Sequence, residues 1–206
     1  MNQISEKKPI PTFTDQMRMR FKGLLDPIGA FLNRLGLMPN TMTILGLVGN
    51  TVGAYFLARG QMTIGGLLIL AMGPVDALDG TMARLRGEAS DFGAFVDSVT
   101  DRYSELIIFA GLIIYYVHQQ DWLLATVTYA AAGGSVLVSY IRARAQSLGS
   151  DTKVGFLTRM ERYLVLAPAL VLNLPWVAVW IIAIFANLTA LQRIWDIRSK
   201  IHARKP

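Results

Sequence analysis

The sequence contains no cysteine and only two histidines among its 206 residues. The absence of cysteine excludes disulfide bonds and thiolate metal sites, and it leaves the redox compartment undetermined. Charged residues are also scarce, at 17% of the chain, whereas hydrophobic residues reach 53%. These proportions are unusual for a soluble globular protein of this length, so the composition favours a membrane protein.

The N-terminal segment lacks the apolar core of a secretory signal peptide. It reads MNQISEKKPIPTFTD and is largely polar, whereas a signal peptide carries an apolar run of roughly 7–15 residues. We therefore expect membrane insertion to begin with the first internal spanning helix.

Long apolar runs dominate the rest of the chain. A helix needs roughly 20 mainly apolar residues to cross the hydrocarbon core, and the length leaves little room for a second domain. We predict an all-α integral membrane fold with six transmembrane helices, over residues 41–58, 62–83, 92–117, 122–141, 161–174 and 176–195. The fifth is the shortest, and it contains Pro168.

The segment before these runs has a different pattern. Residues 1–13 are polar and proline-containing, which predicts disorder. Residues 14–36 interleave basic and apolar side chains, a pattern typical of an amphipathic helix on the membrane surface. We expect this helix to be interrupted near Asp26-Pro27. Residues 37–206 then form the single six-helix transmembrane domain.

The basic residues lie in the gaps between apolar runs. The net charge is +6, but the Lys and Arg residues gather in every second connection and do not form a stripe suited to nucleic acid. This placement suits anionic lipid headgroups. Under the positive-inside rule it predicts that both termini face the cytoplasm, as in a multi-pass protein of the cell's inner membrane.

Four aspartates interrupt the second and third apolar runs. Asp76 and Asp79 are three residues apart, and Asp97 and Asp101 are four apart, so each pair shares one helix face. The turn between the two runs centres near residues 87–88, so the pairs sit at equal depths in an antiparallel hairpin. We therefore expect the four carboxylates to meet inside the cytoplasmic leaflet.

Such a cluster needs compensation. One ionised group in hydrocarbon costs at least ~2.5 kcal/mol, and four neighbouring anions would otherwise take up protons. Hard oxygen ligands suit Mg²⁺ or Mn²⁺, and four carboxylates suffice for two ions of the kind used in phosphoryl chemistry. A single intramembrane Asp often serves as a helix–helix hydrogen bond or a proton relay, but four at matching depths favour a metal site.

Small and helix-breaking residues surround the aspartates. Gly73 and Pro74 precede Asp76, where a kink could open a cavity. Gly80 and Gly93 leave space for a flat ligand beside the carboxylates.

The complete string is Asp76-x2-Asp79-Gly80-x2-Ala83-Arg84-x8-Gly93-x3-Asp97-x3-Asp101. It resembles the signature of the CDP-alcohol phosphatidyltransferase family, with every fixed position filled. The resemblance implies an enzyme of phospholipid biosynthesis that transfers a phosphatidyl group from CDP-diacylglycerol to an alcohol and releases CMP. It also implies the family's six-span architecture with an N-terminal surface helix, and a homodimer.

The resemblance also implies roles for individual residues. Asp76 and Asp97 would bridge two divalent ions, Asp79 would complete the first site, and Asp101 would contact the second ion. Asp101 would also accept the proton of the acceptor hydroxyl. The CDP-diacylglycerol contacts would be Pro39, Asn40, Thr41, Met42, Asp79, Gly80, Ala83, Arg84, Ser90 and Gly93. The start of the first span, from Pro39 to Thr43, also reads plainly as a helix start.

The acceptor alcohol is suggested by arginines on the cytoplasmic side. Any one of them fits simple positive-inside bias, but as a group they would make a pocket for a phosphorylated acceptor. The set is Arg142, Arg144, Arg159, Arg162 and Arg193. With Ser98 after the third aspartate, the pattern is similar to prokaryotic phosphatidylinositol phosphate synthases, which implies inositol phosphate. Glycerol 3-phosphate, as in phosphatidylglycerol phosphate synthases, is the alternative.

A cation transporter is a second class of function for carboxylates inside a membrane. Transport requires polar residues along a path to the far side. The outer halves of the spans, such as residues 67–71 and 107–114, offer almost none, so the pattern favours the enzyme.

Overall fold

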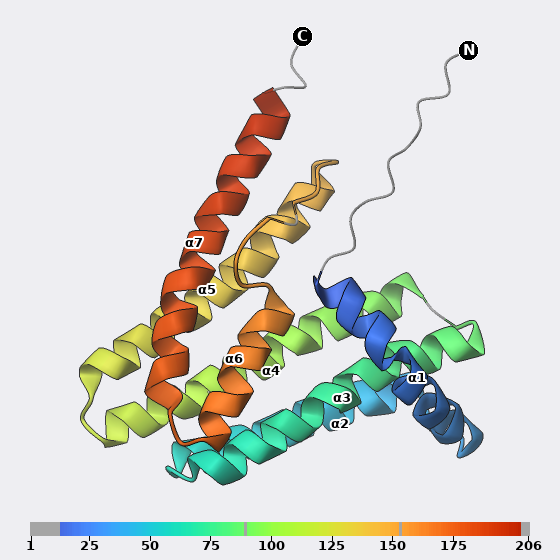
Figure 1. The fold of residues 1–206 in the computed structure, drawn as a ribbon, viewed down its shortest axis with the longest axis horizontal. Coiled ribbons are helices and arrows are strands. Elements are labelled where there is room, and N and C mark those ends of the chain that lie inside the picture. The colour runs from blue at the N-terminus through green and yellow to red at the C-terminus, as the bar shows by residue number, and fades with distance from the viewer. Residues whose placement is uncertain (1–12, 89, 153, 203–206) are drawn as a thin grey trace.

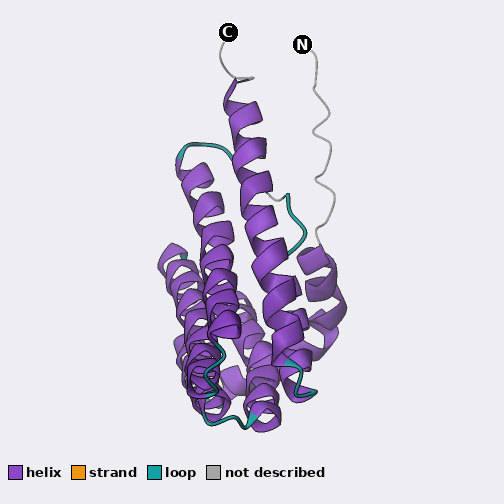
Figure 2. Cartoon of the chain, turned by 90° about the vertical axis from the view of Figure 1, so that its left-hand side faces the viewer, coloured by secondary structure: helices purple, strands orange, loops and turns teal. Residues whose placement is uncertain are grey.

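The computed structural model describes residues 13–88, 90–152 and 154–202. The segment predicted to be disordered, residues 1–13, lies outside the described residues except for Phe13, which begins a helix. The described chain is helical throughout (Figures 1 and 2). Its helices are α1 (Phe13–Arg34), α2 (Pro39–Ala58), α3 (Met62–Arg86), α4 (Asp91–His118), α5 (Trp122–Ser147), α6 (Arg159–Val171) and α7 (Pro175–His202).

The all-α membrane fold predicted from the sequence is confirmed at this level. Each predicted span corresponds to one helix from α2 to α7. By length and composition, the described helices that can cross a membrane are α2, α3, α5 and α7. Helix α4 carries several charged residues in its first half, and α6 has only 13 residues.

Helices α5 and α7 continue beyond their apolar runs. Helix α5 ends at Ser147 and α7 at His202, whereas the predicted spans end at 141 and 195. The added residues are mostly good helix formers, such as Ala, Arg and Gln. Both helices therefore continue, with more polar residues, beyond the apolar runs that hydropathy marks.

Helix α1 packs on the end of α3 that precedes the turn into α4. Leu25 and Leu32 contact a small core formed by Met42, Leu78 and Met82. The interruption predicted near Asp26-Pro27 is wrong, because α1 is one helix that contains Pro27. A proline removes one intrahelical hydrogen bond, and packing against α2 and α3 supports the helix on that side.

The helices form two groups that meet in one core. Helix α2 packs against α3 and α4, while α5 packs against α7, and α6 contacts both α3 and α7 (Figure 1). The main core contains Leu57, Ile69, Phe109, Leu170 and Ile182, all nearly inaccessible to solvent. Close backbone approach depends on glycine: a Cβ on Gly111 would lie 2.5 Å from the Ala54 carbonyl oxygen.

A tight turn connects α3 to α4 and sets the register of that hairpin. Gly87 ends α3 in the left-handed region with φ 70°, a conformation that favours glycine. Ser90 caps α4 by accepting a hydrogen bond of 3.1 Å from the Gly93 N–H. The turn lies where the sequence predicts it, and α2 packs against both α3 and α4.

Candidate active site

Helices α3 and α4, which both pack against α2, bring the four aspartates near one another. Asp79 and Asp101 are buried, and Asp76 is about one-fifth exposed, with 21% of its side chain accessible. Asp97 is near enough to interact electrostatically with each of the other three. The cluster thus combines carboxylates from two helices at one depth.

Arg159, the first residue of α6, lies across this cluster. Its Nη2 is 3.4 Å from Asp76 Oδ2 and also pairs with Asp101 Oδ1. Asp101 has a second, longer ion pair of 3.8 Å with Arg102. A guanidinium therefore bridges one carboxylate from α3 and one from α4.

Helix α2 forms the wall behind the cluster. The Thr43 hydroxyl donates a hydrogen bond of 2.7 Å to Asp79 Oδ2, and Asp79 also accepts from the Gly80 N–H. Gly46 faces Asp76 so closely that a Cβ there would overlap Oδ1 of that carboxylate. These contacts fix two of the four carboxylates against α2.

The chemistry of the donor set fits a divalent cation. In the described part of the chain, no three His, Asp or Glu side chains are arranged to hold an ion as they stand, and Arg159 stands between Asp76 and Asp101. Four carboxylates nevertheless exceed the charge of Arg159 and Arg102 together. The remaining negative charge and the hard oxygen donors suit Mg²⁺ or Mn²⁺.

The residues predicted to contact the nucleotide lie at the same end of the bundle. Pro39 begins α2, and Met42 is buried beside α3. In the last turns of α3, Arg84 donates from Nη2 to the Thr81 hydroxyl at 3.0 Å. The space left by Gly80 admits this arginine, because a Cβ at Gly80 would lie 3.2 Å from Nη1. These residues therefore lie on α2 and α3, the helices that also contact Asp76 and Asp79.

The five predicted acceptor arginines divide into two groups. Arg142, Arg144 and Arg159 are at least partly exposed, and Arg142 pairs with Asp151 at 3.2 Å. Arg162 and Arg193 are buried, with 1% and 4% of their surfaces accessible. Arg162 binds Glu105, while Arg193 donates to the carbonyl oxygens of residues 138 and 154. The guanidinium groups of these two arginines are therefore engaged by atoms of the protein itself.

Sequence reasoning missed three contacting residues. It read Thr43 only as part of a helix start, and it did not single out Glu105 or Tyr163. Glu105 lies four residues after Asp101, on the same helix face, which is a usable signal. Tyr163 lies four residues after Arg159, but its partner in α3 could not be inferred from spacing.

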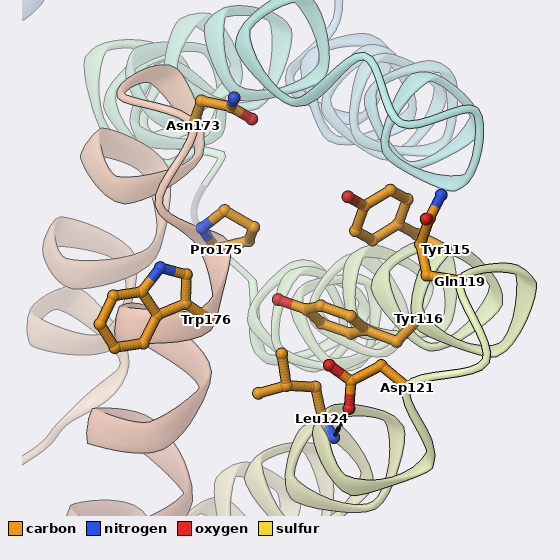
Figure 3. A pocket seen from close by; sticks show the side chains of 8 residues that line it. All are labelled: Tyr115, Tyr116, Gln119, Asp121, Leu124, Asn173, Pro175 and Trp176. Atoms are coloured by element: carbon orange, nitrogen blue, oxygen red, sulfur yellow. Dashed lines mark hydrogen bonds between the residues drawn. The ribbon is translucent and has the colours of Figure 1, made fainter.

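A hollow at the opposite end of the bundle is separate from this cluster. It has a volume of about 350 Å³ and lies between the α4–α5 and α6–α7 connections (Figure 3). Tyr115, Tyr116 and Trp176 line it, and none of the predicted site residues does. The aspartate cluster therefore remains the candidate for chemistry.

Comparisons with known proteins indicate a single family. The family profile described as CDP-alcohol phosphatidyltransferase matches residues 36–191. The chain is 35% identical over 189 residues to an archaetidylinositol phosphate synthase from Pyrococcus horikoshii, covering 90% of this chain and 97% of the relative. It is 33% identical over 188 residues to phosphatidylinositol phosphate synthase from Mycobacterium tuberculosis, covering 86% and 87%.

Solved structures agree with these sequence matches. The crystal structure of the Mycobacterium tuberculosis phosphatidylinositol phosphate synthase with CDP-DAG bound is similar with a TM-score of 0.78 and 31% identity, covering 84% of this chain and 92% of that one. The same enzyme in complex with manganese and citrate also has a TM-score of 0.78, with 30% identity, and covers 84% and 88%.

Proposed function

The chain belongs to the CDP-alcohol phosphatidyltransferase family, and from this premise we propose that it transfers a phosphatidyl group from CDP-diacylglycerol to inositol phosphate. Family membership makes it a membrane transferase of phospholipid biosynthesis that uses a divalent metal, Mg²⁺ or Mn²⁺. The observation that carries the proposal is the pairing of Arg159 with Asp76 and Asp101, because an arginine at this position can pair with the phosphate of an acceptor.

The acceptor follows from two lines of support. The names of the relatives from Pyrococcus horikoshii and Mycobacterium tuberculosis give different lipids, but both names include inositol phosphate. The arginines beside the cluster supply charge for an acceptor that carries its own phosphate. Arg142, Arg144 and Arg159 are the exposed contacts in this proposal, and Arg162 and Arg193 lie beneath them. Glycerol 3-phosphate remains the alternative acceptor.

The proposed roles of the aspartates follow the family resemblance. Asp76, Asp79, Asp97 and Asp101 would hold two divalent ions, with Asp76 and Asp97 shared between them, Asp79 completing the first site and Asp101 the second. When bound, divalent ions neutralise the pyrophosphate charge and stabilise the departing CMP. Thr43 holds Asp79 in place through its hydroxyl. The nucleotide lies along the mouth formed by residues 39–42, Asp79, Gly80, Ala83, Arg84, Ser90 and Gly93.

The transfer step is a single displacement at phosphorus in this proposal. The acceptor hydroxyl oxygen attacks the phosphorus that carries diacylglycerol. As the new P–O bond forms, the bond between this phosphorus and the oxygen of the CMP phosphate breaks. Asp101 accepts the hydroxyl proton. Arg159 leaves Asp101 and pairs with the acceptor phosphate, which orients the hydroxyl towards the reacting centre.

The membrane arrangement is part of the same proposal. All six helices α2–α7 span the bilayer, and α1 lies on its surface with Leu24, Ile28 and Phe31 exposed to the lipid boundary. Both termini and the aspartate cluster face the cytoplasm, in keeping with the basic connections. The functional unit is a homodimer, which mass measurement of the detergent-solubilised protein tests.

Metal-dependent CMP release from CDP-diacylglycerol tests the function. Inositol 1-phosphate, inositol, glycerol 3-phosphate and serine are supplied in parallel, with Mg²⁺, Mn²⁺ or EDTA. We expect release only with inositol 1-phosphate and metal, and its loss in Asp101→Asn. Asp121→Asn is the matched control, because Asn also serves as an N-cap for α5 at the opposite end.

Other outcomes assign other functions. Reaction with glycerol 3-phosphate alone overturns the acceptor assignment and keeps the family. Metal flux into liposomes without CMP release supports the cation transporter and overturns the enzyme.

A further inference from the structure

Helix α3 contains a proline immediately before the aspartate cluster. Pro74 has no N–H, so it cannot donate to the Leu70 carbonyl four residues earlier, and its ring crowds that carbonyl. A backbone carbonyl that loses its partner inside a membrane is costly unless another donor replaces it. Asp76 follows two residues later, so the shape of α3 at this break decides where its carboxylate points.

The side chain of Tyr163 reaches the break from α6. Its hydroxyl lies 2.8 Å from the Leu70 carbonyl oxygen and 3.0 Å from that of Ile69, so its single proton bonds to one or the other. The same oxygen accepts a hydrogen bond of 3.1 Å from the Gly73 N–H. When its proton bonds to Leu70, the closer carbonyl, the hydroxyl replaces the donor that Pro74 lacks while it accepts from the neighbouring Gly73 N–H.

Gly73 makes this insertion possible. A Cβ at this position would overlap the Tyr163 hydroxyl. Gly73, Pro74 and Tyr163 thus act together. Gly73 leaves space for the Tyr163 hydroxyl, and Pro74 leaves a backbone carbonyl without its usual donor, which this hydroxyl can supply. A side chain inserted into the hydrogen-bond ladder is also a recognised cause of a stable helix kink.

We propose that Tyr163 is a positioning residue for Asp76, acting through the α3 backbone. Its hydroxyl bonds to the α3 backbone beside Pro74 and so holds the segment from which Asp76 extends towards Asp97 and Asp101. Helix α6 also supplies Arg159, one turn before Tyr163, which contacts the carboxylates themselves. The inference rests on the proposed function, because the role of Asp76 as a metal ligand belongs to that proposal.

The test compares Tyr163→Phe with Tyr116→Phe. Both changes remove one tyrosine hydroxyl, but the Tyr116 hydroxyl is buried without a hydrogen-bond partner in the described residues and lies at the opposite end of the bundle. Mn²⁺ affinity of the detergent-solubilised protein is measured by electron paramagnetic resonance without substrate. We expect Tyr163→Phe to weaken it roughly tenfold or more, as loss of a group that orients a ligand does.

Steady-state kinetics distinguish a positioning role of Tyr163 from a general loss of structure. We expect Tyr163→Phe to lower kcat for CMP release with little change in the KM for CDP-diacylglycerol, because the nucleotide mouth lies at the other side of Asp76. Tyr116→Phe should match the wild type in both measurements. Equal Mn²⁺ affinities for Tyr163→Phe and Tyr116→Phe overturn the inference, while a wild-type protein that neither binds Mn²⁺ nor releases CMP overturns the proposed function.

A double variant tests the link to the proline. Pro74→Ala restores an N–H that can donate to Leu70, so Tyr163→Phe should cost less Mn²⁺ affinity in this background than in the wild type. Equal costs in the two backgrounds overturn the proposal. If Tyr163→Phe alone fails to fold, the double variant decides: recovery of both folding and Mn²⁺ affinity supports the role, and recovery of folding alone contradicts it.

Discussion

The Thr43 hydroxyl donates a hydrogen bond of 2.7 Å to Oδ2 of Asp79, and so joins the start of α2 to a buried carboxylate of α3. Thr43 lies one turn after Pro39, which begins the helix. The segment predicted to contact the nucleotide and the segment predicted to hold metal are therefore mechanically connected. A change at this hydrogen bond should affect both.

Replacement of Thr43 by Val tests this connection. Valine has a similar shape but removes the donor, and a hydrogen bond to a charged group contributes about 1.5–3 kcal/mol. We expect kcat/KM for CDP-diacylglycerol to fall about tenfold or more, since 1.4 kcal/mol corresponds to tenfold. Thr43→Ser keeps the donor and should keep most of the activity. Equal activities for the Val and Ser variants would contradict the role.

Arg159 pairs with the carboxylate oxygens of Asp76 and Asp101 that a divalent cation would bind in the proposed site. Arg159→Ala should therefore raise the affinity for Mn²⁺, measured without substrate. The same variant should raise the KM for inositol phosphate about tenfold or more, because a charge-assisted contact with phosphate contributes about 1.5–3 kcal/mol.

Arg198→Ala is the matched control for this change. Arg198 lies near the C-terminal end of α7, over the Trp195 ring and 5.8 Å from its centroid. We expect it to leave Mn²⁺ affinity and the KM for inositol phosphate unchanged. An unaltered KM in Arg159→Ala would remove Arg159 from the acceptor site.

The sequence predicts the parts of this site that depend on local spacing. The aspartate pairs share helix faces because their spacings are three and four residues, and Gly87 marks the turn between α3 and α4. Hydropathy locates every helix from α2 to α7, but it marks apolar stretches and not helix ends, so it misses the polar extensions of α5 and α7. The contacts of α6 are also missed, because Tyr163 meets Leu70 across 93 positions and Arg162 meets Glu105 across 57.

The buried pair between Arg162 and Glu105 predicts a loss of stability. Nε and Nη2 of Arg162 bind the two Glu105 oxygens at 2.7 and 3.0 Å, and Nη1 donates to the Leu157 carbonyl. Arg162→Met leaves an uncompensated charge in a protein interior, which costs about 3–5 kcal/mol. We expect a lower thermal unfolding midpoint in detergent.

Arg162→Met combined with Glu105→Gln removes both charges. This double variant should be more stable than Arg162→Met alone, and an equal or lower midpoint would contradict the pairing. The double variant also isolates the predicted acceptor role of Arg162. If that arginine contacts inositol phosphate as well, the KM for inositol phosphate remains raised after stability returns.

Gly46 gives the sharpest test of where Asp76 lies. Glycine to alanine within a helix usually stabilises a protein by about 0.4–1 kcal/mol when space allows. Gly133 in α5 offers that space, since a Cβ there would meet nothing within 4 Å, so Gly133→Ala should keep full activity and Mn²⁺ affinity. At Gly46 the same methyl group would overlap Oδ1 of Asp76.

Gly46→Ala must therefore displace the Asp76 carboxylate or push α2 away from α3. Either movement changes the position of Asp76 or of the helix that supports it, so we expect Mn²⁺ affinity and the rate of CMP release to fall roughly tenfold or more. Because alanine favours the helix more than glycine does, a loss of function cannot be ascribed to a weaker α2. Wild-type Mn²⁺ affinity in Gly46→Ala would mean that Asp76 holds metal in a position away from α2.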